Sequence, residues 1–355
     1  MNKVSPTPSL LKEDLDRILD RVGGLLEELR GKRLFVTGGT GFFGTWLHEC
    51  LARADEEMAL GLSVHFLTRD PAGFQRLHPR LATNPAFHYH AGDVRDFEFP
   101  QGSFTHIIHG ATTSAEATFA NEEPLKKFDT LVQGTRRVLD FALRCGAEKL
   151  LFTSSGCVYG RQPPDLTHVP ETFPGAPDPL DPSQALGHAK RAAEFLCAAY
   201  ARKHEIDVKI LRGFCFVGPH LQMDIQYAIG NFIRDAMQNR PIRVRSDGTA
   251  HRSYLYAADL MVWLWTIFLK GQPSRPYNVG SERDHSIAEL ARLVRDTLGA
   301  KEPVELARDP IANSLPERYV PRTLRARQEL GLEEYTDLPS AILRTASHCV
   351  HSPPP

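Results

Sequence analysis

Residues 37–44 read Thr37-Gly38-Gly39-Thr40-Gly41-Phe42-Phe43-Gly44, and this glycine-rich stretch decides the fold of the chain. An apolar run at 34–36 precedes it, and residues 46–51 have the pattern of a helix. A glycine-rich turn between a strand and a helix is typical of a dinucleotide site. Gly38 would permit the tight turn, Gly41 a close approach to a pyrophosphate, and Gly44 close packing of the helix. A tight turn that binds no ligand is the alternative interpretation.

Strand and helix patterns alternate beyond this turn. The expected helices lie at 125–144 and 184–203, and the expected strands at 34–36, 64–67, 86–90, 105–109, 149–153 and 208–211. This alternation predicts a doubly wound, parallel α/β sheet of the Rossmann type with right-handed crossovers. The proline-rich residues 161–183 should form a loop over the carboxyl edge of the sheet, where ligands bind in such folds.

The pattern becomes less regular beyond Gly218-Pro219. Short extended pieces are expected near 241–245 and 276–279, and helices near 225–238, 256–270, 286–298 and 337–348. We therefore predict a smaller C-terminal substrate-binding lobe that is interleaved with the first domain. We predict four parts: an N-terminal helical extension (1–30), a Rossmann domain that binds the dinucleotide (31–215), a segment that forms most of the substrate-binding lobe (216–350), and a tail (351–355).

The N-terminal extension has apolar residues at helical spacing over residues 8–30. This pattern indicates an amphipathic helix, or a pair of helices broken near Gly23-Gly24, because glycine disfavours a helix interior. Two interpretations stay open: the helix forms a dimer contact, or it packs on its own domain.

Composition excludes several classes of partner. The 355 residues include 42 Lys+Arg and 43 Asp+Glu, which favours neither nucleic acid nor an anionic membrane. No stretch is apolar enough to span a bilayer, and charged residues from Lys12 to Asp16 stand where a signal peptide needs an apolar run. The six cysteines show no paired or metal-ligand spacing, so a reducing cytoplasm is expected. We interpret His88 and His90 as polar strand residues and expect no metal site.

Further motifs follow the glycine turn in a set order. They are Gly92-Asp93-Val94, His109-Gly110-Ala111, Thr153-Ser154-Ser155-Gly156-Cys157-Val158-Tyr159-Gly160, Lys190, Arg212 with Gly218-Pro219, Arg252-Ser253-Tyr254 before Asp259, and Tyr277-Asn278-Val279-Gly280. With these motifs the chain resembles the extended short-chain dehydrogenase/reductases, in the NAD(P)-dependent nucleotide-sugar epimerase/dehydratase group. The resemblance covers residues 31–335 and implies hydride transfer between a sugar carbon and the nicotinamide.

The resemblance also implies a catalytic set, from which this chain departs. The family uses a Tyr base, a Lys four residues later on the same helix face, and a Ser or Thr that contacts the reacting oxygen. Ser155 and Lys190 match, but Leu186 occupies the position of the Tyr. His188 lies about 200° around the helix from Leu186 and should face elsewhere. Tyr159 is a closer candidate, although Tyr is commonly structural in that motif.

Other family positions are altered too. Gly156 and Cys157 replace the Asp-Glu pair of the dehydratases, which disfavours a standard 4,6-dehydratase. Leu131 and Cys215 replace two family Asn residues. The cofactor cradle is therefore kept, while polar groups around the substrate have become apolar.

The resemblance assigns cofactor contacts residue by residue. The expected NAD(P)-binding residues are Thr37, Gly38, Thr40, Gly41, Phe42, Phe43, Gly44, Arg69, Asp93, Val94, Ala111, Thr112 and Lys190. NAD-specific members tend to have Asp where this chain has Thr68, and Arg69 is suited to a 2′-phosphate. We therefore favour NADP slightly over NAD. Alternatively, Arg69 stacks on adenine or pairs with Asp70 or Asp96.

For the substrate, Arg252 matches an Arg that binds the sugar-nucleotide diphosphate, because a guanidinium binds phosphate in a bidentate manner. Arg318 is a candidate second clamp, and Cys215, Asn231 and Phe232 are further expected substrate contacts. We predict an enzyme, a homodimer, that acts on a nucleotide-activated sugar at an atypical site. The alternative is a catalytically degenerate member that binds cofactor or sugar nucleotide as a non-enzymatic or regulatory subunit.

Overall fold

The structure, a computed structural model, describes residues 9–112, 122–224, 228–311 and 314–351. Residues 1–8 of the expected extension, residues 225–227 of one expected helix, and tail residues 352–355 lie outside the described residues. Within the described ranges, no helix is long and apolar enough to cross a membrane.

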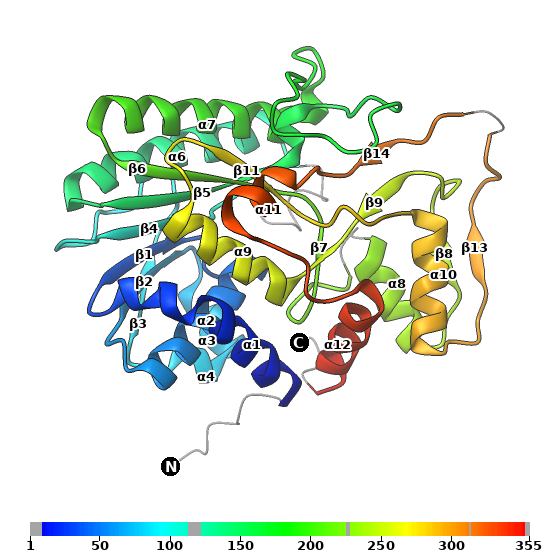
Figure 1. Cartoon of the computed structure of the whole chain (residues 1–355), viewed down its shortest axis with the longest axis horizontal. Helices are drawn as coiled ribbons and strands as arrows, with labels where there is room; N and C mark the ends of the chain where they lie inside the picture. The colour runs from blue at the N-terminus through cyan, green and yellow to red at the C-terminus, as the bar shows by residue number, and fades with distance from the viewer. Residues whose placement is uncertain (1–8, 113–121, 225–227, 312–313, 352–355) are drawn as a thin grey trace.

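A seven-stranded parallel sheet forms the centre of the protein (Figure 1). The strand order is β11-β6-β5-β4-β1-β2-β3, and each adjacent pair is parallel. The bounds are β1 (Arg33–Thr37), β2 (Ser63–Thr68), β3 (Phe87–Ala91), β4 (His106–His109), β5 (Lys149–Ser155), β6 (Asp207–Gly213) and β11 (Pro276–Val279). The strand order reverses at β1, so the ligand crevice of such a fold lies outside its carboxyl end. The predicted Rossmann-type α/β fold is confirmed.

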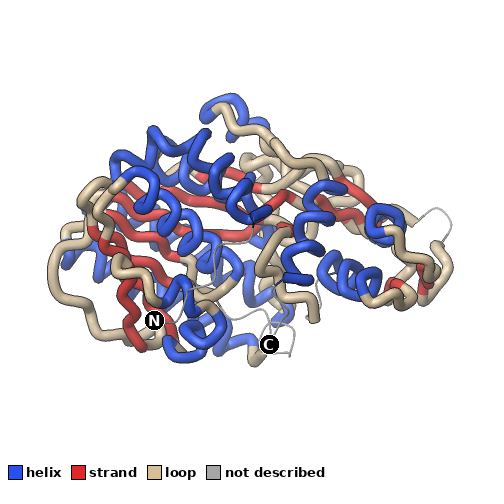
Figure 2. Tube along the Cα trace, turned by 90° about the horizontal axis from the view of Figure 1, so that it is seen from below, coloured by secondary structure: helices blue, strands red, loops and turns tan. Residues whose placement is uncertain are grey.

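Helices cover both faces of this sheet, as Figure 2 shows. α6 (Pro124–Cys145) and α7 (Ala185–His204) pack together on one face, and α2 (Phe42–Met58) and α9 (Ala257–Lys270) lie on the other. Side chains of β1 alternate between these layers. Phe35 joins the core under α6 and α7, whereas Leu34 and Val36 join the core on the opposite face. Burial on both faces is what a parallel sheet requires.

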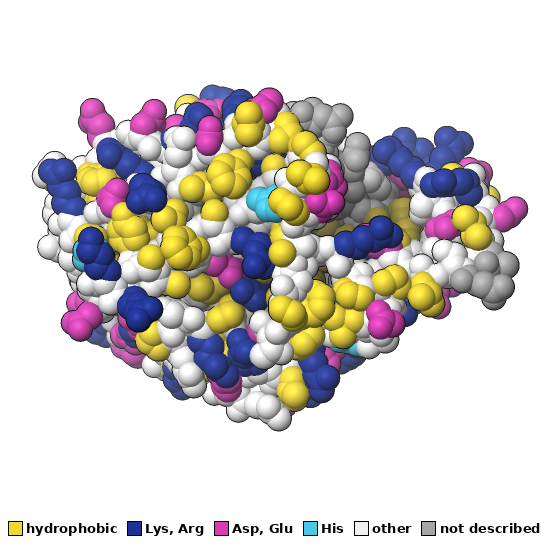
Figure 3. All heavy atoms as spheres, turned by 90° about the horizontal axis from the view of Figure 1, so that it is seen from above, with side chains coloured by type: hydrophobic (Ala, Val, Ile, Leu, Met, Phe, Trp, Pro, Cys, Tyr) yellow, Lys and Arg dark blue, Asp and Glu magenta, His cyan; other side chains and the backbone are white. Residues whose placement is uncertain are grey.

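The outer face of α6 and α7 keeps exposed hydrophobic side chains, which Figure 3 shows over this side of the molecule. Phe195 on α7 is 72% exposed and Leu125 on α6 is 71% exposed.

α1 (Ser9–Leu26) is continuous and is extended by a short 3-10 turn (Glu27–Leu29), so the predicted break near Gly23-Gly24 is wrong. Each glycine costs about 1 kcal/mol in a helix interior. Burial of Ile18, Val22 and Leu26 offsets that cost, at about 1.5–3 kcal/mol for each large side chain. The helix contacts α9 and α2, which agrees with the interpretation that it packs on its own domain.

Most of the chain beyond residue 216 forms a smaller lobe beside the sheet (Figure 1). Its main elements are α8 (Ala228–Met237), β8 (Ile242–Val244), α10 (Ile287–Leu298), β13 (Val304–Leu306) and α12 (Leu338–His351). In contrast, α9 and β11 return to the main sheet, β11 as the edge strand beside β6. The two parts of the chain are therefore interleaved.

Shorter elements complete the described structure. They are α3 (Pro71–Leu77), α4 (Pro79–Ala82), a 3-10 turn (Gly156–Tyr159), a second 3-10 turn (Pro182–Gln184), β7 (Phe216–Val217), β10 (Leu255–Tyr256) and α11 (Leu324–Leu330). A three-stranded sheet has the order β12-β9-β14, with β12 (Asp284–Ser286), β9 (His251–Ser253) and β14 (Arg318–Tyr319). Strands of two or three residues carry too little periodicity to be predicted from the sequence.

Candidate active site

The turn after β1 has the geometry that its glycines predicted. Gly38 has a φ of 74°, and a Cβ atom there would lie 2.5 Å from the carbonyl carbon of Gly110. A Cβ atom on Gly44 would lie 2.1 Å from the carbonyl carbon of Gly39, so this start of α2 packs on the turn backbone. A Cβ atom on Gly41 would meet no described atom closer than 3.9 Å. The turn is therefore closed on its inner side and open at Gly41.

This open side fits the pyrophosphate of a dinucleotide. Thr40 and Gly41 are exposed, while Phe42 and Phe43 at the start of α2 are half-buried. Gly41 is the N-cap residue, and no side chain caps the helix there. The first N–H groups of α2 are thus available to an anion, which the helix dipole also favours.

A buried network ties the turn to β4 and α6. Thr135 donates its hydroxyl hydrogen to the Leu131 carbonyl (2.7 Å), so it accepts from Nε2–H of His109 (3.0 Å). The Ala111 N–H donates to the hydroxyl oxygen of Thr37 (3.1 Å), which lies 2.7 Å from Nδ1 of His109. Burial lowers the pKa of His109 to about 3, so the ring is neutral. The network ties the ends of β1 and β4 to α6 at the site.

The end of β2 presents Arg69 to solvent. Arg69 is exposed and forms no ion pair with any residue that the structure describes, so the alternative pairing with Asp70 or Asp96 is not observed. Asp70 instead caps α3 through the Gly73 N–H (2.8 Å). Thr68 is buried, 3.4 Å from the hydroxyl of Thr40.

The motif after β3 is held by local contacts. Asp93 forms an ion pair with Arg95 (2.8 Å), which lowers the pKa of the carboxyl group. Val94 is buried against α6, where a Cβ atom on Gly134 would lie 2.7 Å from one of its methyl carbons. Thr112, beyond β4, is exposed.

Lys190 projects from α7 onto the carboxyl end of β5. Its Nζ donates to the Thr153 carbonyl (2.7 Å) and lies 4.8 Å from the ring centre of Phe152. The side chain is buried, and burial lowers its pKa to about 8. An ammonium group has three N–H donors, and among the described residues one of them is used, in the hydrogen bond to the Thr153 carbonyl. Two N–H groups therefore remain for a ligand such as a ribose.

Leu186 stands one turn before Lys190 on the same helix face. It is half-buried and belongs to none of the hydrophobic clusters of the described residues. His188 points away, as predicted, and its Nε2 lies 2.9 Å from the Asp178 carbonyl oxygen. No proton-exchanging group therefore replaces the family Tyr from α7.

Ser155, the last residue of β5, contacts a side chain that the sequence did not indicate. Its hydroxyl oxygen accepts from the Cys157 N–H (3.3 Å) and lies 3.3 Å from the hydroxyl of Tyr319. Tyr319 comes from β14, in the run where only Arg318 was singled out. No sequence signal links Tyr319 to Ser155, because a two-residue strand shows no pattern and the two lie far apart in the chain.

Tyr159 has a structural environment. Its hydroxyl donates to Oδ1 of Asn278 (2.7 Å) and accepts from Arg212 (2.8 Å), whose guanidinium also pairs with Glu194. The side chain is buried, and burial raises its pKa to about 12. This geometry favours the structural role over a catalytic one.

The two arginines expected to clamp the diphosphate lie on adjacent strands but face opposite ways. Arg252 on β9 is paired in register with Tyr319, and Arg318 with His251, so their side chains alternate across the small sheet. Arg252 contacts Glu317, and Arg318 forms an ion pair with Asp284 (2.8 Å). The structure therefore does not bring the two guanidinium groups together.

The other expected substrate contacts are mostly apolar. Cys215 is half-buried between β6 and β7, and burial raises its thiol pKa to about 11. Phe232 on α8 is buried in the core, whereas Asn231 is half-buried. Within the part of the chain that the structure describes, no cluster of His, Cys, Asp or Glu could hold a metal ion.

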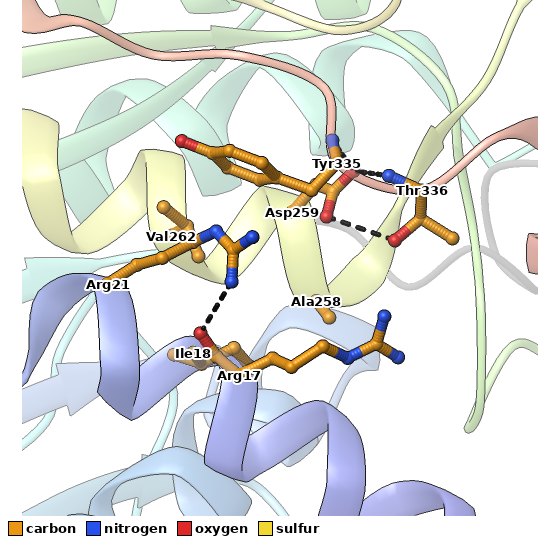
Figure 4. A pocket seen from close by; sticks show the side chains of 8 residues that line it. All are labelled: Arg17, Ile18, Arg21, Ala258, Asp259, Val262, Tyr335 and Thr336. Carbon is orange, nitrogen blue, oxygen red and sulfur yellow. Dashed lines mark hydrogen bonds between the residues drawn. The ribbon is translucent and has the colours of Figure 1, made fainter.

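A small pocket lies elsewhere, between α1, α9 and the loop before α12 (Figure 4). Asp259 at its wall accepts from the N–H groups of Tyr335 and Thr336, and burial raises its pKa to about 6. Arg21 stacks on the ring of Tyr335 at 3.9 Å. The lining includes none of the expected site residues, so we interpret this pocket as a packing gap.

Comparison with known proteins identifies the family. The model of the NAD dependent epimerase/dehydratase family matches residues 34–280. The chain belongs to this family. It is thus a member of the nucleotide-sugar epimerase/dehydratase group of enzymes, and the resemblance inferred from the motifs is confirmed.

The chain is similar in sequence to a known enzyme and similar in fold to two solved structures. UDP-glucuronic acid decarboxylase 1 of Xenopus tropicalis is 28% identical over 320 residues, which cover 90% of this chain and 72% of that protein. A dTDP-glucose 4,6-dehydratase of Streptomyces venezuelae, solved with NAD, has a TM-score of 0.74 at 24% identity and covers 90% of this chain and 97% of its own. UDP-glucuronic acid 4-epimerase of Bacillus cereus, solved with NAD, has a TM-score of 0.74 at 19% identity, with coverages of 90% and 99%.

Proposed function

We propose that this chain binds NAD(P) at the 37–44 turn and catalyses hydride transfer at a carbon of a nucleotide-activated sugar. One observation carries the proposal. Lys190 and Ser155 lie at the carboxyl edge of the central sheet, and the turn that is open at Gly41 lies at the same edge. When bound, the nicotinamide would accept or return the hydride. Lys190 would hold the nicotinamide ribose, and Ser155 would hold the reacting sugar oxygen.

The remaining expected contacts take supporting roles in this proposal. The first N–H groups of α2 would bind the pyrophosphate, and Arg69 would meet a 2′-phosphate, which favours NADP over NAD. Arg252 would exchange its contact with Glu317 for the substrate diphosphate. The names of the similar proteins specify UDP-glucuronic acid and dTDP-glucose, so UDP- and dTDP-linked sugars are the substrates to test first.

A binder without catalysis is the second candidate. Leu186 favours it, because this side chain has no proton to exchange, and so does the ion pair of Arg252 with Glu317. One experiment separates the two functions. The protein is titrated with NAD(P)⁺ and NAD(P)H by calorimetry, and single turnovers with UDP- and dTDP-sugars are then followed by the absorbance of the reduced nicotinamide. Binding with hydride transfer supports the enzyme, binding without transfer supports the binder, and no binding refutes both.

We also propose that the protein is a homodimer joined through the outer face of α6 and α7. Phe195 and Leu125 leave apolar area exposed on this face. Sedimentation velocity should show a dimer that Phe195→Asp dissociates, whereas Glu205→Lys beyond the end of α7 should leave it intact. A monomeric parent protein would refute the proposal.

A further inference from the structure

Tyr319 places a phenol at the carboxyl edge of the sheet, beside the serine that the family chemistry uses. Its hydroxyl lies 3.3 Å from the hydroxyl oxygen of Ser155. The residue as a whole is half-buried, at the carboxyl edge where the turn at Gly41 is open. The guanidinium of Arg252, the expected diphosphate ligand, lies 6.0 Å from the ring centre of Tyr319.

The position of this phenol is built into the fold. β14 pairs with β9, and the next residue, Val320, is buried and accepts the Val169 N–H (2.9 Å) from the proline-rich segment. The ring of Tyr319 packs against that of Phe214, with 4.7 Å between centroids and a tilt of 37° between the rings. Gly156, next to Ser155, provides the space for the hydroxyl, because a Cβ atom there would lie 2.8 Å from it.

We propose that Tyr319 is the proton donor of this site, that it replaces the tyrosine missing at Leu186, and that the reaction is reduction of a keto group on a nucleoside-diphosphate sugar. This inference rests on the proposed function, because it needs a bound cofactor and a sugar at Ser155. It adds the identity of the acid, the direction of the reaction and the oxidation state of the substrate.

Protons and electrons balance in this direction. The carbonyl carbon gains a hydride, with its two electrons, from bound NAD(P)H, and the carbonyl oxygen gains one proton. Ser155 gives its hydroxyl hydrogen to that oxygen while it takes the hydrogen of Tyr319, or Tyr319 donates directly. The product is an alcohol and the tyrosine is left as phenolate. Water restores the phenol after the product leaves.

The surroundings of Tyr319 suit an acid and not a base. Burial raises the pKa of the phenol well above its usual value, and the Cys157 and Cys215 thiols act in the same direction. The hydrogen bond to Ser155 and the charge of Arg252 oppose this rise only in part. Among the described residues Lys190 does not contact the phenol, since it bonds to the Thr153 carbonyl. The phenol is therefore protonated at neutral pH, which is the form that can give a proton to the alkoxide formed by hydride addition.

The test compares the parent protein with Tyr319→Phe, which keeps the ring on Phe214 and removes only the hydroxyl. The control is Tyr277→Phe, which likewise removes a hydroxyl bonded to a polar side chain, that of Glu329 on α11 (2.9 Å). UDP-4-keto-6-deoxyglucose and its dTDP counterpart are the probes, with NADPH and NADH. Tyr319→Phe should bind NAD(P)H as the parent does and slow single-turnover oxidation of the nicotinamide by about 10²-fold or more.

A second readout does not depend on activity. In protein labelled with ¹³Cζ-tyrosine, the resonance lost in Tyr319→Phe belongs to Tyr319, and it should shift when the ketosugar nucleotide and NADP⁺ are both bound. Failure of the parent to bind NAD(P)H would refute the proposed function itself. Binding with equal hydride-transfer rates in parent and Tyr319→Phe, or an unshifted resonance, would overturn the role of Tyr319 alone. Binding without any transfer would support the non-catalytic binder and would refute the enzyme together with the role of Tyr319.

Discussion

A Cβ atom on Gly156 would lie 2.8 Å from the hydroxyl oxygen of Tyr319. It would also lie 2.6 Å from Cζ of Phe214, whose ring packs against that of Tyr319. Related dehydratases are expected to carry an Asp where this chain has Gly156. The phenol of Tyr319 therefore occupies the space beside Ser155, and it can do so because residue 156 has no side chain.

The first prediction follows from that contact. Gly156→Ala should destabilise the protein by about 1–3 kcal/mol, because the added methyl must displace an aromatic ring or the phenol. Urea unfolding measures the change. Gly24→Ala is the matched control: it lies in α1 with no neighbour within 4 Å of the new methyl, and alanine there should add about 0.5–1 kcal/mol. An unchanged midpoint for Gly156→Ala would contradict this packing.

The second prediction separates two glycines of the 37–44 turn. Gly41→Val should leave the unfolding midpoint unchanged, because the site is open, and should abolish measurable NAD(P) binding in calorimetry, because the side chain fills the pyrophosphate space. Gly44→Ala should instead lower stability, since its methyl would meet the Gly39 backbone. Normal cofactor affinity in Gly41→Val would show that the cofactor does not lie on this turn.

The third prediction concerns the choice between NADP and NAD. Arg69 is exposed and free of ion pairs with the described residues, so it can meet a 2′-phosphate without breaking a contact. Arg69→Ala should weaken NADPH binding by 10- to 100-fold, about 1.5–3 kcal/mol for a charge-assisted contact, and leave NADH binding nearly unchanged. Equal loss for both cofactors in calorimetry would indicate stacking on adenine instead.

The fourth prediction is a pH dependence of stability. His109 is neutral in the fold with a pKa of about 3, and in the unfolded chain its pKa is near 6.5. Between these values the unfolded chain binds more protons, so the stability contributed by neutral His109 is lost as pH falls from about 6.5 towards 3, at up to about 1.4 kcal/mol per pH unit. His109→Gln cannot titrate and should show a shallower loss in urea unfolding at several pH values. Identical slopes would mean that His109 is protonated in the native protein.

The sequence predicted those parts of the site whose roles are local. Gly41 and Gly44 have their nearest neighbours within the same turn, so their spacing alone indicated that Gly41 needs open space and that Gly44 needs close packing. The contact of Gly38 with Gly110 depends on the pairing of β1 with β4, which the spacing does not show. His188 is a similar case, because helix geometry alone places it away from Leu186. The predicted break at Gly23-Gly24 was wrong for the opposite reason. The free-energy cost of two glycines in a helix is smaller than the stabilisation from burying apolar side chains along α1, and that burial depends on distant parts of the chain.

Tyr319 shows what sequence reasoning could not reach. It meets Ser155 only because β14 pairs with β9 and because Val169 fixes the backbone of Val320. None of these contacts leaves a periodic pattern, and the strand is two residues long. Strand register also decided that Arg318 faces away from Arg252, although the sequence singled out both as phosphate ligands.

The last prediction concerns Leu186, the vacant position beside Lys190. Leu186→Tyr places a phenol one helical turn before Lys190, whose ammonium has two free N–H groups. The positive charge should lower the pKa of this new phenol, so that the phenol can serve as a base. The parent has no such base, because Tyr319 stays protonated. Reduction of bound NADP⁺ by a tightly bound sugar nucleotide should therefore rise by about 10²-fold or more in Leu186→Tyr. Stopped-flow absorbance of the reduced nicotinamide measures it in one turnover.

The stability cost of this change should be at the lower end of about 1–3 kcal/mol, because Leu186 is half-buried and outside the hydrophobic clusters. Leu186→Phe is the control, with the same ring and no hydroxyl, and should not gain the reaction. The double variant Leu186→Tyr with Tyr319→Phe should keep the oxidising reaction, since the new phenol acts through Lys190 and not through Tyr319. A parent protein that already reduces bound NADP⁺ rapidly, and is not slowed by Ser155→Ala, would show that another base carries the proton.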